Sequence, residues 1–451
     1  MLLIHIPRLT NRLGYTLNVI FRHLLRTDFE ITADLDFFEH FEGPRLCYGP
    51  QRLGNACYLR SANLLFETKI DEPNLRPATH NGIPTLFALR NPDSDLPFDP
   101  LAAIFFCLSR YEEYLPHITD EHGRFPATQS VAYRNGFLLI PVVDHWVAQL
   151  AALIANRYPD WQYTLPTFEV EDSIDIDSAF CYKHKGLPRT LAGMGRDFFT
   201  SDDRTLVRKR LRTLAGKAGD PYDCFDFILD CHRAHPALNL QFFALVGDYN
   251  VFDMPISYLD PHFRELLQHL GDYAKMGLHA SYASHDKPAL IATECERLQN
   301  IMHRKVVRNR FHFLRFRLPR SYNSLLDAGI LHDYSMGFSE EAGFRAGTGN
   351  PYPFFDLESD SETPLTIHPF AAVDSTFYRY KHTTLDTAEQ TSRTLIDQAR
   401  AAGTTLSLVW HNHCLSDDFE WHGWRSLYQR TLDYADQALA SARSNTHHTQ
   451  P

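Results

Sequence analysis

Apolar and polar residues follow two different patterns along the chain, and the change between them divides it into two parts. Over 13–26 and 98–115 apolar side chains recur every three to four residues, which predicts two helices, and short strand-like pieces such as 64–70 lie between them. The turn-rich stretch 157–167, RYPDWQYTLPT, predicts a boundary between domains. We therefore expect residues 1–165 to form a smaller, mixed α/β domain of unknown function.

Beyond this boundary, short apolar strands alternate with helical stretches. The predicted strands are 168–177, 239–247, 275–281, 306–314, 333–338, 365–370 and 404–410. The clearest helices are 287–302, 319–329, 385–402 and 424–440. Such alternation predicts a parallel sheet with helical crossovers, and about seven parallel strands predict an α/β fold with a distorted (β/α) barrel over 166–440. The polar end of the chain, 441–451, is expected to be a disordered tail.

The composition is that of a globular protein and argues against nucleic acid as a partner. The 451 residues exceed one ordinary core, and the contents of 44% hydrophobic and 22% charged residues are average. The chain has 44 basic against 55 acidic residues, and no Lys/Arg run contains interleaved aromatic residues. The eight cysteines are scattered without a CxxC pair, which indicates reduced thiols.

The start of the chain does not look like a targeting segment. A short apolar run is interrupted by His5 and Pro7, and no small-residue cleavage site follows it. No stretch approaches the ~18 consecutive apolar residues that a membrane helix needs. We therefore expect a cytoplasmic protein without stable membrane insertion, and the sequence leaves its oligomeric state open.

Two aspartates, Asp175 and Asp177, stand two residues apart in VEDSIDIDSA (170–179). On a strand both carboxylates point to the same face as Ser173. Like charges side by side destabilise each other unless a cation lies between them or one of them takes up a proton. The pair alone is equally compatible with a solvated strand end, and DxD also binds a divalent ion and diphosphate in many nucleotide-sugar glycosyltransferases.

Other predicted strands also end in polar side chains. These are His279, Arg310 with His312 on one alternating face, and His411 with His413. Each has an ordinary alternative, such as a hydrogen-bonded core histidine or a solvated basic face. Enzymes with parallel sheets carry their chemistry at the carboxyl ends of strands. Carboxylate and neutral imidazole bind zinc and similar divalent ions, so this joint placement is typical of a metal-dependent hydrolase.

Longer segments then carry a resemblance to a known family. They are LSRYEEYLPHITDEHGRF (108–125), DIDSAF (175–180), MGLHASYAS (276–284), NRFHFLRFRLPRSY (309–322), DYSMGFSEEAGFRAGTGNPYPFFDL (333–357) and LVWHNHCLSD (408–417). With them the chain resembles the polysaccharide deacetylase superfamily, carbohydrate esterases of the NodB-homology type. More narrowly it is similar to an uncharacterised bacterial branch with an N-terminal domain of unknown function, and the resemblance covers nearly the whole chain.

The resemblance implies three catalytic residues. Asp175 matches the catalytic base of the superfamily, and Arg310 matches the arginine that pairs with this base. His411 matches the histidine that protonates the leaving group, with His413 as the alternative. A carboxylate base and an imidazole acid together can hydrolyse an amide or ester bond.

The resemblance also implies a divalent metal ion, with zinc as the expected one. Asp177 and His279 match two of its ligands, but the second histidine of the superfamily motif falls on Ala283. The third ligand is therefore left between His312, which we include in the metal site, His285 and water. The site departs from the superfamily pattern at this position.

The implied function is that of a metal-dependent hydrolase that removes an acetyl group from an N-acetylated or O-acetylated sugar. A cytoplasmic location favours a precursor of a surface polysaccharide, such as a nucleotide- or lipid-linked sugar, as the acetylated carbohydrate substrate. Two alternatives remain. One is a metal-dependent nucleotide-sugar glycosyltransferase that uses the aspartate pair, and the other is a non-catalytic carbohydrate-binding module on a deacetylase fold.

Overall fold

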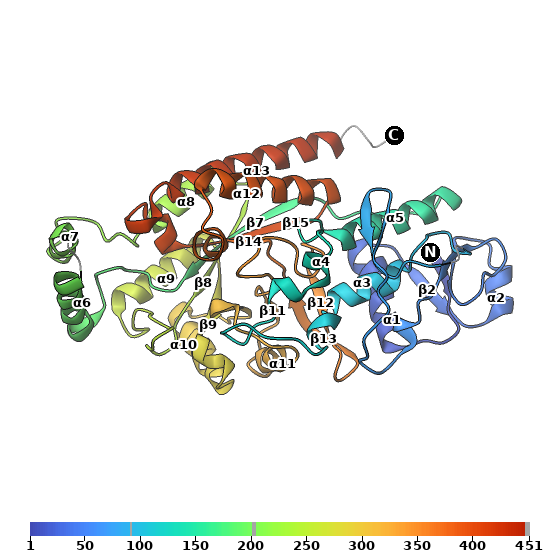
Figure 1. The fold of residues 1–451 in the computed structure, drawn as a ribbon, viewed down its shortest axis with the longest axis horizontal. Helices are drawn as coiled ribbons and strands as arrows, with labels where there is room; N and C mark the ends of the chain where they lie inside the picture. The colour runs from blue at the N-terminus through green and yellow to red at the C-terminus, as the bar shows by residue number, and fades with distance from the viewer. Residues whose placement is uncertain (91–92, 201–203, 447–451) are drawn as a thin grey trace.

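The computed structural model describes residues 1–90, 93–200 and 204–446, and its N-terminal part is built around a four-stranded parallel sheet (Figure 1). In the order β2-β1-β3-β4, the strands are β1 (Leu2–His5), β2 (Phe29–Thr32), β3 (Arg45–Gly49) and β4 (Cys57–Arg60). The helices are α1 (Asn11–Leu17), which continues as a π-helix over Asn18–Leu24, α2 (Leu35–His40), α3 (Pro100–Leu108), α4 (Val131–Arg134) and α5 (Val142–Arg157). A hairpin of β5 (Ala78–His80) and β6 (Ile83–Thr85) completes this part.

The helix predicted at 98–115 is present but shorter, as α3. Asp99 begins it, because its carboxylate accepts a hydrogen bond from the amide of Ala102, and Pro100 occupies the first helical position. The helix cannot continue past Arg110, whose backbone adopts the left-handed conformation with φ 52°. Every residue of α3 is buried, which agrees with its apolar sequence.

The prediction of a strand-like piece at 64–70 is wrong. Residues Leu64–Phe66 form a short 3-10 helix instead. The side chains of Arg12 and Thr10 donate hydrogen bonds to the carbonyl groups of Leu64 and Leu65, at 3.2 and 2.5 Å. These carbonyl groups are therefore satisfied without a neighbouring strand.

The larger sheet has nine strands in the order β12-β13-β11-β10-β9-β8-β7-β15-β14. They are β7 (Glu169–Ile176), β8 (Asn239–Ala244), β9 (Lys275–Ala280), β10 (Arg308–Phe311), β11 (His332–Asp333), β12 (Tyr352–Asp356), β13 (Ser361–Ile367), β14 (Ala372–Val373) and β15 (Thr405–His411). All neighbouring strands are parallel except β12, which is antiparallel to β13. Six of the seven predicted strands are present. The prediction of a strand over 333–338 is wrong beyond Asp333, the last residue of β11, because Ser335 turns back and donates two hydrogen bonds to the Asp333 carboxylate.

The closed barrel of about seven strands is not confirmed. Two strands, β12 and β14, were not predicted, and within the described part of the chain no ladder joins them across the two edges of the sheet. The antiparallel β12 occupies one edge, and β14 at the other edge has only two residues, so neither offers a long parallel neighbour for closure. What the structure establishes is a mixed α/β fold with parallel sheets.

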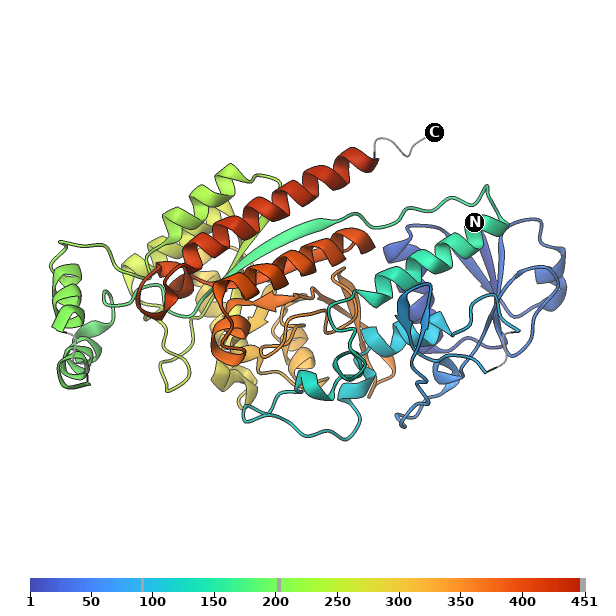
Figure 2. The ribbon, with the colours of Figure 1, turned by 45° about the horizontal axis from the view of Figure 1, so that its top comes forward.

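Eight further helices belong to this part. They are α6 (Gly186–Thr200), α7 (Arg204–Leu214), α8 (Phe225–Ala234), α9 (Pro261–Tyr273), α10 (Ala289–Met302), α11 (Arg320–Asp327), α12 (Leu385–Ala402) and α13 (Trp424–Thr446). The four predicted helices correspond to α10–α13, and α12 and α13 lie side by side (Figure 2). Helix α13 continues into the segment 441–451 that was expected to be a disordered tail, and residues 447–451 lie outside the described residues.

One cluster of buried apolar side chains runs through both parts, with Phe105 and Trp146 on one side and Ile174 on the other. Buried Arg345 adds two hydrogen bonds to Glu113, at 2.9 and 2.7 Å. The division into two domains therefore stays a prediction. Over the described ranges, no helix combines the length and apolar character that crossing a bilayer requires.

Candidate metal centre and active site

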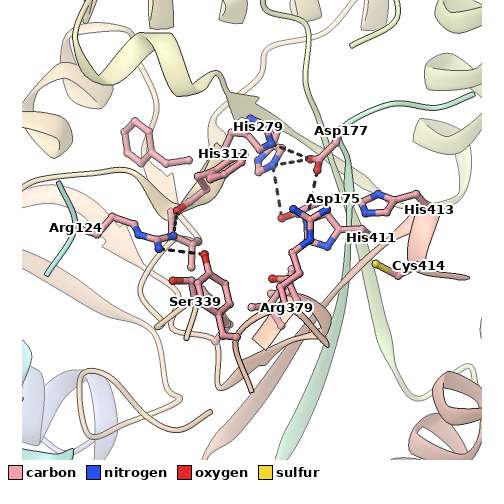
Figure 3. A pocket seen from close by; sticks show the side chains of 18 of the residues that line it. Arg124, Asp175, Asp177, His279, His312, Ser339, Arg379, His411, His413 and Cys414 are labelled. Carbon is pink, nitrogen blue, oxygen red and sulfur yellow. Dashed lines mark hydrogen bonds and ion pairs between the residues drawn. The ribbon is translucent and has the colours of Figure 1, made fainter. Parts of the chain in front are cut away.

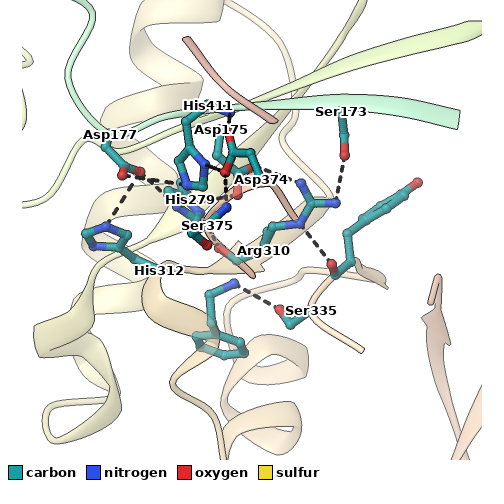
Figure 4. A network of polar contacts seen from close by, with 12 residues as sticks. Ser173, Asp175, Asp177, His279, Arg310, His312, Ser335, Asp374, Ser375 and His411 are labelled. Carbon is teal, nitrogen blue, oxygen red and sulfur yellow. Dashed lines mark hydrogen bonds and ion pairs between the residues drawn. The ribbon is translucent and has the colours of Figure 1, made fainter. Parts of the chain in front are cut away.

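The carboxyl ends of four strands bring together all six residues that the sequence singled out (Figures 3 and 4). The six are Asp175 and Asp177 from β7 and its end, His279 from β9, Arg310 and His312 from β10 and its end, and His411 from β15. Parallel pairing places His411 opposite Asp175, and Arg310 opposite His279. The order β10-β9-β8-β7-β15 therefore gathers side chains that are far apart in the sequence.

Asp177, His279 and His312 form a group that fits a metal ion. The Oδ1 atom of Asp177 lies 3.2 Å from Nε2 of His279 and 3.5 Å from Nε2 of His312. The three candidate ligand atoms lie within 4.8 Å of one another. Asp177 Oδ1 and His279 Nε2 are buried and have no hydrogen-bond partner within the described part of the chain. Since buried polar atoms are rarely left unsatisfied, and one carboxylate with two imidazoles is a common zinc donor set, these residues fit a divalent cation.

Each of the two imidazoles is held in its orientation by a hydrogen-bond acceptor at Nδ1, the ring nitrogen that does not face Asp177. Nδ1 of His279 lies 2.9 Å from the carbonyl oxygen of Arg310, and Nδ1 of His312 lies 2.8 Å from Oδ1 of Asp253. When Nδ1–H donates to these acceptors, the lone pair of Nε2 points toward Asp177. This is the arrangement by which proteins prepare histidines for metal binding.

Asp253 is a candidate site residue that sequence reasoning missed. It lies in the connection between β8 and α9, where no local pattern marks it. The backbone amides of Tyr282 and Ala283 donate to its carboxylate, at 2.8 and 3.2 Å. The position where the superfamily motif has its second histidine, Ala283, therefore serves here through its backbone, by holding the carboxylate that orients His312.

The structure brings His312, and not His285, to the candidate metal group. Burial alone would lower the pKa of His312, but Asp177 and Asp253 outweigh it and raise the pKa to about 9. A cation held by Asp177 would take the place of this proton. His285 lies in a short 3-10 helix, and burial followed by the charge of Arg315 lowers its pKa.

Asp175 is held by a completely buried guanidinium. Arg310 donates from Nη1 to Oδ1 of Asp175 at 2.7 Å and from Nη2 to Oγ of Ser173 at 3.0 Å. Its Nε donates to the carbonyl oxygen of Tyr334 at 2.9 Å, and the ring of Phe243 packs against its face. The charge of Asp175 is thus neutralised on one side, while its Oδ2 atom faces His279 at 3.8 Å.

His411 approaches Asp177 from the neighbouring strand β15 and pairs with a second carboxylate. Its Nδ1 and its backbone amide each lie 2.7 Å from an oxygen of Asp374, and its Nε2 lies 3.7 Å from Oδ2 of Asp177. Burial alone would lower the pKa of His411, but these carboxylates raise it to about 10. The imidazolium is therefore the favoured form. Sequence reasoning missed Asp374 because β14, which it follows, has only two residues.

His413 lines the same pocket but has a different environment. Burial, followed by the nearby charge of His411, lowers its pKa to about 4. No ion pair joins it to a carboxylate among the residues that the structure describes. The Asp374 carboxylate pairs with His411 and not with His413. This difference favours His411 over His413 as the candidate proton donor.

The N-terminal part contributes to the wall of the pocket (Figure 3). Arg124 donates to the carbonyl oxygen of Phe313 at 2.7 Å and to the hydroxyl of Tyr380 at 3.1 Å. Phe313 and Leu314 both have left-handed backbones, with φ 59° and 53°. Such strained conformations persist where the surrounding contacts hold them, and they often lie at functional sites.

Comparisons with known proteins add little to this geometry. A family of unknown function (DUF7033) matches residues 2–159. No curated protein matches the chain. Three similar solved structures are named as polysaccharide deacetylases. One from Mycobacterium smegmatis is 13% identical and has a TM-score of 0.38, with 62% of this chain and 92% of that one covered. One from Bordetella bronchiseptica, named for O-antigen biosynthesis, is 11% identical with a TM-score of 0.30, and 60% of this chain and 88% of that one are covered. One from Bacillus cereus is 10% identical with a TM-score of 0.29, and 60% of this chain and 87% of that one are covered.

Proposed function

We propose that the chain is a metal-dependent hydrolase that removes an acetyl group from an N-acetylated or O-acetylated sugar. One observation carries the proposal: a candidate cation-binding group, a carboxylate and a cationic imidazole converge in one pocket. Oδ2 of Asp175 lies 3.8 Å from Nε2 of His279, Nε2 of His411 lies 3.7 Å from Oδ2 of Asp177, and the ligand atoms of the group lie within 4.8 Å of one another. Hydrolysis of an amide or ester needs these three elements at one place.

The metal ion that we propose is zinc, since one carboxylate and two imidazoles suit it. When bound by Asp177, His279 and His312, it supplies a Lewis acid that polarises an acyl oxygen and a water molecule. The protein orients these ligands through Asp253 and the carbonyl group of Arg310. This oriented donor set supports a resident cation over two solvated aspartates.

The remaining residues handle the proton. Asp175 accepts a proton from the attacking water, and Arg310 keeps its carboxylate in position. As the bond between the acyl carbon and the leaving nitrogen or oxygen breaks, His411 donates its proton to that atom, and acetate leaves. Asp374 orients the imidazolium of His411 through Nδ1, so its Nε2–H faces the site. Oδ2 of Asp175 lies 3.8 Å from the candidate metal ligand His279, and Nε2 of His411 lies 3.7 Å from the candidate ligand Asp177.

The substrate that we propose is an acetylated sugar of a surface-polysaccharide precursor, handled in the cytoplasm. The pocket is lined by the aromatic rings of Phe313, Tyr380 and Trp421 beside polar groups such as Ser339. Rings of this kind pack against the apolar faces of sugars, while polar groups read hydroxyls. A second imidazole, His312, in the place of the missing histidine also supports catalysis over a mere binding module.

The test is metal analysis of the purified protein combined with a screen of N- and O-acetylated sugars and nucleotide sugars for acetate release. We expect about one zinc ion per chain and acetate release that a chelator abolishes. Asp175→Asn should keep the metal and lose the activity, and Ser339→Ala serves as a control in the same pocket. Full activity in Asp175→Asn would overturn the proposal. Calorimetric binding of a nucleotide sugar without acetate release would favour the glycosyltransferase alternative.

A further inference from the structure

Two helices, α6 and α7, lie at the end of the molecule opposite the N-terminal sheet (Figures 1 and 2). Both expose apolar side chains to solvent. On α6, Leu187, Leu191 and Phe198 follow helical spacing and are 79, 64 and 71% exposed. On α7, Leu211 and Leu214 are 47 and 38% exposed. In a globular protein such a stripe normally faces the core, so an exposed one indicates a binding surface.

The loop that follows β8 extends this apolar surface. Its residues Tyr249, Val251 and Met254 are exposed. Arg189 of α6 ties the loop to the helix, since its guanidinium lies 4.2 Å from the ring centre of Tyr249 and donates to the carbonyl oxygen of Pro255 at 2.7 Å. We call α6, α7 and residues 249–254 the tip.

Exposed apolar side chains concentrate at and beside the tip. Among the described residues, 20 large hydrophobic side chains are exposed, and 10 of them fall within 187–259. This segment is about a sixth of the chain, so the concentration is about three times the average. Scattered apolar residues on a surface need no explanation, whereas a concentration of this kind marks a contact with something apolar.

The same region is strongly basic in an acidic protein. Residues 183–217 contain ten Lys and Arg against three Asp, a net charge of +7, while the whole chain carries −11. Arg208, Arg212 and Lys217 are exposed. On α7 the exposed Arg208 and Arg212 thus lie beside the exposed Leu211 and Leu214.

We propose that the tip docks onto a membrane surface that contains anionic lipids. An amphipathic helix with Lys and Arg beside exposed Leu and Phe lies in the membrane interface, where the cations meet lipid phosphates and the apolar side chains enter the acyl boundary. Nucleic acid would match the charge but not the aliphatic stripe. An apolar protein partner would match the stripe but not the exposed cations Arg208, Arg212 and Lys217. The partner must therefore combine negative charge with an apolar phase.

The tip borders the candidate active site. A second pocket begins at Asp177 and His312 and extends to Leu206 and Arg210 of α7. A protein docked by its tip would therefore open this cleft next to the lipid surface, where a sugar carried on a lipid is within reach. The docking itself goes beyond the proposed function and does not depend on it, because it can be measured without turnover.

The experiment is co-sedimentation of the full-length protein with vesicles. Vesicles of phosphatidylcholine alone are compared with vesicles of equal parts phosphatidylcholine and phosphatidylglycerol, at low and at high salt. We expect binding only to the anionic vesicles and release at high salt, since the attraction is screened. Arg208→Glu with Arg212→Glu should weaken the binding on the order of 30-fold or more, because each surface cation contributes about a factor of five.

Apolar and charged controls exist at the opposite end of the molecule. Leu187→Ser with Leu191→Ser should reduce the binding, whereas Leu35→Ser with Phe37→Ser on α2, which are also exposed, should not. Arg22→Glu with Lys69→Glu is the matched control for charge. Thermal melting shows whether each variant is folded, and hydrolysis of a soluble acetylated sugar should be unchanged in the tip variants.

Several results would overturn the inference. They are equal binding to neutral vesicles, equal losses in the tip and control variants, and no binding to anionic vesicles. Self-association through the tip, or binding of an oligonucleotide, without any vesicle binding would also overturn it. Because docking is read by sedimentation and hydrolysis by acetate release, failure of one proposal is distinguished from failure of the other.

Discussion

The two parallel sheets of this molecule share an architecture, but only one of them carries a candidate site. At the carboxyl end of β1 in the N-terminal sheet stands His5, a buried imidazole whose pKa is lowered by burial. Its Nδ1 atom is buried and has no hydrogen-bond partner within the described ranges. At the carboxyl ends of β7 and β15, in contrast, Asp177 and His411 face each other across 3.7 Å. The carboxyl ends of parallel strands can therefore hold a functional site in either sheet, but side chains of opposite charge converge only in the larger one among the described residues.

Two aspartates make the same point. Asp99, near the N-terminal sheet, accepts hydrogen bonds only from neutral donors, the hydroxyl of Tyr48 and backbone amides, and burial raises its pKa to about 6. Burial acts on Asp177 in the same direction, but the charges of His312 and His411 lower its pKa well below the usual range. The surrounding cations, rather than burial, distinguish the aspartate of the candidate site from Asp99.

The largest effect is expected from Asp177→Asn, because an amide is a poor replacement for the carboxylate that two imidazoles face. The protein should lose its metal ion, and acetate release should fall to background, while its melting curve in the absence of metal stays close to that of the wild type. Metal analysis and an acetate assay measure both. His5→Gln, the corresponding position of the N-terminal sheet, should change neither metal content nor activity. If both variants lost the metal equally, the contrast between the sheets would be wrong.

The next effect concerns the acid. We expect His411→Gln to lower kcat by about 10²- to 10⁴-fold, the usual contribution of general acid–base catalysis, with the metal retained. Asp374→Asn should lower kcat less and shift the alkaline limb of the pH–rate profile to lower pH, because the carboxylate that raises the pKa of His411 is removed. Steady-state kinetics over a range of pH measures this. An unchanged profile in Asp374→Asn would contradict the role of the pair.

A smaller effect, on stability, should separate two buried arginines. Arg310→Met leaves Asp175 buried without its cation, and such a loss typically costs about 3–5 kcal/mol. Arg12→Met in the N-terminal part should cost less, because the carboxylate of its partner Asp360 is a quarter exposed and can be hydrated. Denaturant unfolding of both variants measures the difference. Equal losses would show that the environment of Asp175 is not special.

The smallest effect is the pH dependence that arises from Asp99. Its pKa is raised on folding, so between 3.8 and about 6 the folded state binds the proton that the unfolded state has lost. The free energy of unfolding should therefore fall as pH rises through this window, by at most about 1.4 kcal/mol per pH unit from this group. Below the window its contribution is fully present. Asp99→Asn should be less stable but should lack this slope, which denaturant unfolding at several pH values can measure.

Local pattern predicted much of the larger sheet. The alternation of apolar runs indicated six of the nine strands of that sheet and the last residue of β11, and the helix over Leu385–Ala402 agrees with its prediction at both ends, since Thr384 caps it and Gly403 takes the left-handed conformation after it. The strands β12 and β14 were not predicted from the sequence, because β14 is too short to show a periodic pattern and β12 pairs antiparallel at an edge of the sheet. Closure of a barrel also depends on pairing between distant segments, which a local pattern does not contain.

By itself the sequence determined which side chains stand at strand ends, because residues on a strand alternate strictly between two faces. It thereby indicated Asp175, Asp177, His279 and His411 as candidates, whose roles stay predictions. Only the tertiary structure decided how these side chains are oriented. Asp253 and Asp374 come from segments without any periodic signal, and they turn the imidazoles of His312 and His411 toward the site. Such contacts depend on loop conformation and long-range pairing, so the residues next to Asp253 and Asp374 in the sequence do not predict them.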